Sequence, residues 1–167
     1  KCCQGLCTTG ICQTTTDVSS VAGPNAGGGP APGGNVNLRD ETAIRQYLNA
    51  NGVTIQANKS SCALTSSGAN CVNLVGLSQN TLDTLIAATR KCGNCISING
   101  GTEPGHVSHG LAYPGTVDVN YSPAAAQALE ATGIRYNGNF GKGYTCEKKG
   151  VGAVSNCSEA DWMHVEI

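Results

Sequence analysis

The sequence has few aromatic or charged residues and no long apolar segment. Only 4% of its 167 residues are aromatic and 13% are charged, and the net charge is −1. Such a charge balance offers neither a basic surface for nucleic acid nor a polybasic patch for a membrane surface. No apolar run reaches the roughly 18 residues that a transmembrane helix requires. We therefore expect no nucleic-acid partner and no transmembrane segment.

Cysteine, in contrast, is abundant, with ten residues in the chain. The spacings do not form two matched pairs of the kind that bind structural zinc. The pattern instead predicts disulfide bonds and an extracellular, periplasmic or cell-surface location. The sequence starts at Lys1 without a signal peptide, so we expect a processed product. We predict two local bridges in the carboxyl-terminal part, Cys62–Cys71 and Cys146–Cys157.

Composition divides the chain into three parts. Residues 1–12 hold four cysteines and almost no apolar residues, so bridges among these cysteines are expected to order the segment. This segment is also a candidate for contacts in a homo-oligomer or filament. Residues 13–37 are rich in Gly, Pro and Thr and are predicted to be a linker. The folded domain is predicted over 38–167.

Within that domain the pattern predicts an α+β fold. Helices are expected after the N-cap residues Asp40, Ser78 and Ser122. The Cys-x-x-Cys at 92–95 follows the second of these helices and does not begin one, so we expect it to be structural. Strands are predicted at 53–55, 95–98, 116–120, 134–136 and 162–167, with polar loops around the cysteine pairs. We predict a small antiparallel sheet with helices on one face and a zinc cleft on the other, stapled by disulfides.

The chain has three histidines, His106, His109 and His164. In the strand at 116–120, Asp118 alternates with two valines, and in the last predicted strand His164 alternates with Met163 and Val165. If both strands direct their aliphatic side chains to the helices, Asp118 and His164 share the other face. A turn at 113–115 can bring His109 back to Asp118. Two imidazoles and one carboxylate are suitable ligands for Zn²⁺ and leave one position for water or substrate.

These residues resemble the zinc motifs of the LAS group of metallopeptidases. That group includes D-Ala-D-Ala carboxypeptidases, L-alanyl-D-glutamate endolysins and the hedgehog signalling domain. The resemblance rests on Ser108-His109, on Asp118 within Val-Asp-Val, and on the run Asp161-Trp162-Met163-His164. It covers roughly 38–167 and implies that His109, Asp118 and His164 bind zinc. It also implies that Asp161 is the general base of peptide hydrolysis.

Other polar residues near these motifs are candidates for supporting roles. Glu166 is a rival to Asp161 as the base, because it shares the strand face of His164. His106 and Glu103 lie upstream of His109, where they can hydrogen-bond a substrate or orient a ligand. Ser108 and Trp162 are further candidates for lining a substrate cleft. His106 is thus a candidate catalytic group, and Glu103, Ser108 and Trp162 are candidates for substrate binding.

The sequence therefore supports two alternative functions. The first is a secreted or surface zinc peptidase that cuts cell-wall peptides containing D-amino acids, with peptidoglycan as the substrate. The second is a non-catalytic surface, adhesion or filament protein that has the same fold, with zinc structural or absent. The family has an upstream Arg for the substrate, whereas residues 99–103 contain none, and this favours the second function. The complete His109, Asp118 and His164 set with Asp161 favours the first.

Overall fold

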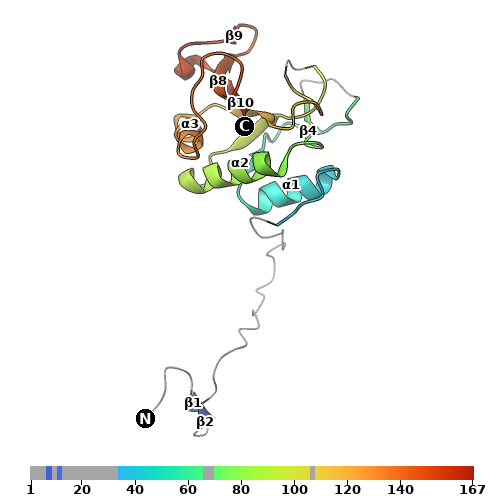
Figure 1. Cartoon of the computed structure of the whole chain (residues 1–167), viewed down its shortest axis with the longest axis vertical. Coiled ribbons are helices and arrows are strands. Elements are labelled where there is room, and N and C mark those ends of the chain that lie inside the picture. Colours follow the sequence, from blue (N-terminus) through green and yellow to red (C-terminus); the bar gives the residue numbers. More distant parts are fainter. Residues whose placement is uncertain (1–6, 9–10, 13–33, 66–69, 106–107) are drawn as a thin grey trace.

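The structure is a computed structural model that describes residues 7–8, 11–12, 34–65, 70–105 and 108–167 (Figure 1). Three α-helices and a six-stranded mixed sheet make up the main part, which confirms an α+β fold. Of the cysteine-rich segment, the strands β1 (Cys7–Thr8) and β2 (Ile11–Cys12) are described, and they pair antiparallel with Cys7 opposite Cys12. The predicted linker lies outside the described residues as far as residue 33.

The six strands of the main sheet have the order β3-β6-β7-β10-β8-β9. Their bounds are β3 (Thr54–Ile55), β6 (Ser97–Gly100), β7 (Thr116–Asn120), β8 (Gly143–Lys148), β9 (Gly152–Ala153) and β10 (Trp162–Glu166). The prediction of an antiparallel sheet is wrong at one edge, because β3 pairs parallel with β6. A parallel pair needs a long crossover, and the segment between these strands contains a whole helix.

All three helices begin at the predicted N-cap residues. They are α1 (Glu41–Ala50), α2 (Gln79–Cys92) and α3 (Pro123–Glu130). The Asp40 carboxylate accepts hydrogen bonds from two free amides of the first turn, as the Ser78 and Ser122 hydroxyls do from one each. The second helix ends at Gly93 in the left-handed conformation, with φ of 64°.

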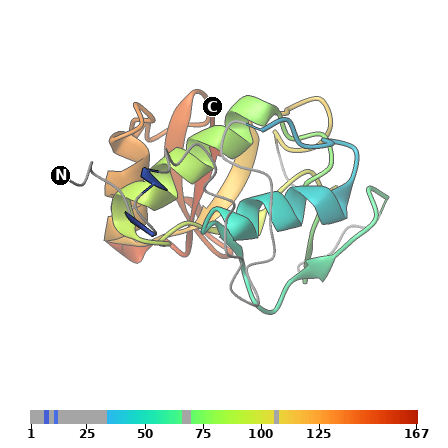
Figure 2. The same cartoon turned by 90° about the horizontal axis from the view of Figure 1, so that it is seen from below.

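The hydrophobic core lies between the helices and the sheet. Figure 2 shows α1 and α2 lying across the strands. The aliphatic residues that alternate along β7 and β10 are fully buried in this core: Val117, Val119, Met163 and Val165. They pack with apolar residues of the helices, among them Leu48, Leu85 and Leu129. The burial of this face directs the alternate side chains of both strands to the opposite face.

Several connections differ from the predicted ones. Residues 134–136 form no strand, because only Tyr136 forms a bridge, to Tyr144 of β8, before a glycine-rich turn begins. The loop predicted over 57–73 contains a short parallel pair, β4 (Ser60–Ser61) with β5 (Cys71–Val72). The chain after Cys146 forms the β8–β9 hairpin, and a 3-10 turn, Cys157–Glu159, begins at the second cysteine. Val36, in the predicted linker, packs against the core.

Disulfide bonds join three pairs of cysteines in the described part. The predicted bridges Cys62–Cys71 and Cys146–Cys157 are both present, with Cα–Cα distances of 5.4 and 5.2 Å. A third bridge joins Cys92 to Cys95, at 5.6 Å between Cα atoms. Among the described residues, no helix has the length and apolar character needed to cross a bilayer.

The bridges predict a graded effect on stability. Replacing Cys146 and Cys157 with Ala should lower the free energy of unfolding by about 2–4 kcal/mol, because the bridge closes a loop with a sequence separation of 11. The matched Cys92→Ala/Cys95→Ala variant opens a loop with a sequence separation of 3. Its free energy of unfolding should therefore fall by about 1 kcal/mol less than that of the first variant. Urea denaturation of both double variants measures the difference, and an equal or reversed order would contradict it.

Candidate metal centre

The pairing of β7 with β10 brings Asp118 and His164 together. The register places His164 directly opposite Asp118, on the face of the sheet away from the valines. Each residue is only 3% exposed, so the shared face is covered. Gly100 of β6 lies on the other side of Asp118, where a Cβ atom would approach Asp118 Oδ2 to 2.8 Å. The absence of a side chain there leaves room for the carboxylate.

His109 reaches the same place from the connection between β6 and β7. The predicted turn is present: the Tyr113 amide donates to the Gly110 carbonyl at 2.9 Å, and the Thr116 amide donates to the Tyr113 carbonyl at 3.0 Å. Ser108 has a φ of 61°, which redirects the chain just before the histidine. The imidazole of His109 is 1% exposed. The eight residues between His109 and Asp118 therefore fold back on themselves.

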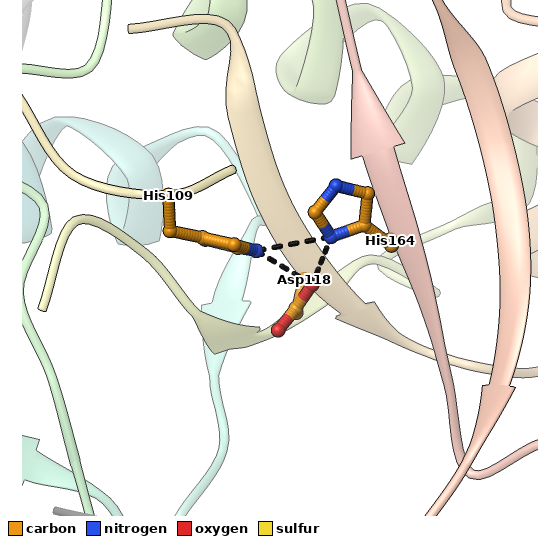
Figure 3. A group of neighbouring side chains, drawn as sticks. All are labelled: His109, Asp118 and His164. Atoms are coloured by element: carbon orange, nitrogen blue, oxygen red, sulfur yellow. Dashed lines mark hydrogen bonds and ion pairs between the residues drawn. The ribbon is translucent and has the colours of Figure 1, made fainter. Parts of the chain in front are cut away.

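Three ligand atoms converge in a small triangle (Figure 3). His109 Nε2 lies 3.1 Å from Asp118 Oδ1 and 3.0 Å from His164 Nδ1. His164 Nδ1 lies 3.2 Å from Asp118 Oδ1. Tetrahedral zinc, with ligands at about 2.0–2.1 Å, separates two ligand atoms by about 3.3–3.4 Å. The triangle therefore has nearly the size that one such ion requires, and the three residues could hold a metal ion.

A backbone carbonyl sets the orientation of His109. The Gly101 carbonyl oxygen lies 2.6 Å from His109 Nδ1 and can only accept a hydrogen bond, so Nδ1 carries the hydrogen. In the neutral imidazole this leaves the lone pair on Nε2, which faces the triangle. A histidine held in this way by its second nitrogen is typical of metal ligands.

Glu103 in turn holds the backbone of Gly101. Its carboxylate accepts hydrogen bonds from the Gly101 amide at 3.0 and 3.1 Å and from the Asn73 amide at 2.8 Å. Glu103 is 1% exposed, which keeps it from a substrate in solvent and favours a positioning role. Gly101 is packed so closely that a Cβ atom would collide with the Asn73 carbonyl oxygen. The connection before His109 is therefore fixed on two sides.

The second nitrogen of His164 faces Glu166. His164 Nε2 lies 3.3 Å from Glu166 Oε1, an ion-pair distance without hydrogen-bond geometry. Glu166 Oε1 also accepts a hydrogen bond from the Gly141 amide at 2.8 Å. The ring of Phe140 contacts the His164 ring edge to face, with centroids 5.0 Å apart. Glu166 thus lies on the side of His164 that faces away from the triangle.

The electrostatics of the triangle favour a positive charge within it. Burial would by itself lower the pKa of His109, but the hydrogen bond and charge of Asp118 raise this pKa above its usual value. Burial would likewise raise the pKa of Asp118, yet hydrogen bonds and charges of both histidines hold it well below its usual range. Asp118 is therefore a carboxylate at neutral pH, and a cation between the imidazoles is stabilised.

Two cavities border residues of the triangle. The first, of about 240 Å³, is lined by all three ligand residues together with Gly105, Phe140, Glu147 and Trp162. The second, of about 420 Å³, shares Asp118 and Trp162 with the first. Its other lining residues are mostly amides and lysines: Gln56, Asn58, Lys59, Asn70, Asn99, Asn120, Lys149 and Asp161. Asp118 and Trp162 thus border both cavities.

The remaining predicted site residues have different positions. Asp161 forms the bend before β10 as expected, and its Oδ2 accepts a hydrogen bond from the Lys149 amide at 2.8 Å. It lines the larger cavity, whose lining includes neither histidine. Trp162 lines both cavities. His106 lies outside the described residues.

Glu147 is a site residue that the sequence analysis missed. It lines the smaller cavity and accepts a hydrogen bond from Trp162 Nε1 at 2.7 Å through Oε2. The signal was present as an alternation in β8, where Tyr144 and Cys146 are buried in the core and Thr145 and Glu147 take the other face. The interpretation of this region as a loop around Cys146 concealed that alternation.

Comparisons with known proteins found no match: no protein-family model, no curated protein and no solved structure is significantly similar to the chain. The chemistry of the site is therefore argued from its geometry.

The triangle predicts pH-dependent zinc binding. Asp118→Asn or His109→Ala should weaken Zn²⁺ binding at least about 100-fold, because each removes one of three ligands. Affinity of the unmodified protein should also fall as the pH drops through the raised pKa of His109, since protons then compete for Nε2. Competition with a chromophoric chelator from pH 8 to pH 5 measures both effects. Glu159→Gln, at an exposed position, is the control, and unchanged affinity in either ligand variant would refute the site.

A second prediction concerns Glu103. Glu103→Gln places an amide nitrogen where backbone amides donate, and should lower the free energy of unfolding by about 1–3 kcal/mol. Because Gly101 then loses its anchor, zinc affinity should also fall about 10–100-fold. Urea denaturation of the metal-free variant and chelator competition measure the two quantities against Glu159→Gln. If the Glu103→Gln variant is destabilised but binds zinc as tightly as the wild type does, Glu103 only supports the fold.

Proposed function

We propose that the chain is a zinc-dependent peptide hydrolase. The observation that carries the proposal is the triangle of His109, Asp118 and His164 at the wall of an open cavity. Structural zinc sites are closed by four protein ligands, whereas catalytic sites use three and keep one position open. The only metal-ligating group of at least three residues in the described part is this one. When bound, zinc would lower the pKa of a water molecule and polarise a carbonyl group.

The donor set supports zinc rather than a hard cation. Two imidazole nitrogens and one carboxylate oxygen are ligands typical of zinc, while Ca²⁺ and Mg²⁺ prefer oxygen alone. Both imidazoles have an acceptor near the second nitrogen, the Gly101 carbonyl for His109 and Glu166 for His164. Such acceptors orient the rings and strengthen the ligands. The chain's own contribution to catalysis is therefore a pre-formed set of ligands.

The larger cavity supports a peptide as the substrate. Five of its lining side chains are primary amides, which can both donate to and accept from the backbone of a peptide. Gln56 Oε1 is buried there and has no hydrogen-bond partner among the described residues. Lys59 donates to the Asn99 carbonyl at 2.7 Å, and this holds its ammonium group at the cavity. A peptide carrying a carboxylate fits this lining, and the resemblance to LAS peptidases points to cell-wall peptides within that class.

The disulfides support a compartment outside the cytoplasm. Three bridges in the described part are stable in an oxidising environment. We accordingly propose that the protein acts outside the cytoplasm, in a secreted, periplasmic or surface-displayed form. The cysteine-rich residues 1–12 would then serve to attach or assemble the domain.

The competing hypothesis, a non-catalytic surface protein with the same domain, has one specific observation in its favour. The segment upstream of His109 has no Arg, and Glu103 in that segment is committed to backbone amides. The two lysines of the larger cavity offer positive charge from another direction. The hypotheses therefore differ in whether the cavities bind and turn over a peptide.

Hydrolysis tests the proposal directly. The zinc-loaded protein should release products from muropeptides that contain D-amino acids, measured by mass spectrometry. The metal-stripped protein and His164→Ala should both be inactive, and added zinc should restore only the former, because His164 supplies a ligand. If the folded, zinc-loaded protein cleaves neither muropeptides nor general peptides, the non-catalytic hypothesis is favoured instead.

A further inference from the structure

Peptide hydrolysis needs a group that takes a proton from the attacking water. Besides Asp118 and the buried Glu103, whose carboxylate is bound to backbone amides, three carboxylates lie near the triangle. They are Glu147 of β8, Asp161 at the start of β10 and Glu166 within β10. The identity of this group rests on the proposed function. A general base must reach the attacking water. An ion held by His109, Asp118 and His164 would border the cavity that all three residues line, so the lining of this cavity separates the three carboxylates.

Glu147 is on the ligand face by register. It lies opposite Trp162 in the β8–β10 pair, and Trp162 lies opposite Asn120 in the β10–β7 pair. Two residues further along β10, His164 lies opposite Asp118. Residues directly across a pair, and residues two apart in one strand, share a face of the sheet. Glu147 therefore points to the same side of the sheet as His164 and Asp118.

Glu147 also lines the same cavity as all three ligands. The lining of the 240 Å³ cavity includes His109, Asp118 and His164 together with Glu147, Phe140 and Trp162. The indole Nε1 of Trp162 holds Glu147 Oε2 at 2.7 Å. No described residue donates to the other oxygen of this carboxylate. A carboxylate oriented by one donor, with one oxygen directed to no partner, is suited to accept a proton.

The other two carboxylates are engaged elsewhere. Asp161 is exposed, accepts from the Lys149 amide at 2.8 Å, and lines the larger cavity instead. Glu166 accepts from the Gly141 amide and faces the outer nitrogen of His164. Neither lines the cavity that contains all three ligands. We propose that Glu147 is the general base and proton carrier of the site.

The Glu147 carboxylate takes one proton from a water molecule while the water oxygen bonds to the scissile carbonyl carbon. The protonated Glu147 then gives that proton to the amide nitrogen as the carbon–nitrogen bond breaks. The products are a carboxylic acid and an amine, one water is consumed, and Glu147 returns to its carboxylate form.

The test compares Glu147→Gln with Asp161→Asn and with the exposed control Glu159→Gln. Zinc content and thermal melting first establish that each variant is folded and loaded. Acetohydroxamic acid, which needs a proton acceptor when it binds a metal, is the probe in calorimetry. Glu147→Gln should bind it at least about tenfold more weakly, since a charge-assisted hydrogen bond is lost. Its kcat/KM on muropeptides should fall about 10²–10⁴-fold, more than that of Asp161→Asn.

The outcomes separate this inference from the proposed function. The inference is overturned if the Glu147→Gln variant binds the hydroxamate and hydrolyses muropeptides as well as the Glu159→Gln control does. It is also overturned if kcat/KM falls further in Asp161→Asn than in Glu147→Gln. If the loaded wild type hydrolyses nothing, the proposed function fails, and the hydroxamate comparison still decides the position of Glu147. A wild type that binds zinc but no hydroxamate contradicts an open cavity and overturns the inference. Should Glu147→Gln misfold, Glu147→Asp replaces it, with the same expected order of affinities.

Discussion

The antiparallel pairing of β7 with β10 is the constraint on which the site depends. Two strands that come from distant parts of the sequence meet in a register that places His164 opposite Asp118. The valines and the methionine of these strands enter a fully buried core, so a shift of either strand by one residue would expose its apolar side chains and turn its ligand inward. The hydrophobic core and the candidate metal site are thus two consequences of one register.

The third ligand depends on polar interactions instead. His109 lies in a connection without regular structure, and a chain of hydrogen bonds runs from the buried Glu103 through Gly101 to its imidazole. A buried carboxylate is costly unless backbone amides compensate its charge, and here the amides of Gly101 and Asn73 do so. The hydrogen bonds that order this connection also set the direction of the His109 lone pair. The same logic extends to Asp118, whose charge needs a cation beside it in a site shielded from solvent.

Much of the fold was predictable because its signals are local. Capping residues such as Asp40 and Ser78 act within one helical turn, and the alternation in 116–120 and 162–167 shows which residues share a face. The turn at 113–115, two disulfides and the His109, Asp118 and His164 group followed from such patterns. The parallel pair at the edge of the sheet was missed because pairing direction depends on the path of α2, which no local pattern contains. Glu147 was missed for a related reason: its neighbour Trp162 lies 15 residues away, and only their pairing shows that both face the ligands.

The place of β10 in the sheet has a consequence for the order of events during folding. It lies between β7 and β8 although it follows both in the sequence. Until it inserts, the sheet consists of two separate halves, and the partners His109 and His164 are 55 residues apart. Pairings of this range form late, because the loss of chain entropy precedes the contacts that repay it. An ion that needs both histidines could therefore bind only once the sheet has closed, so a bound ion would report this closure.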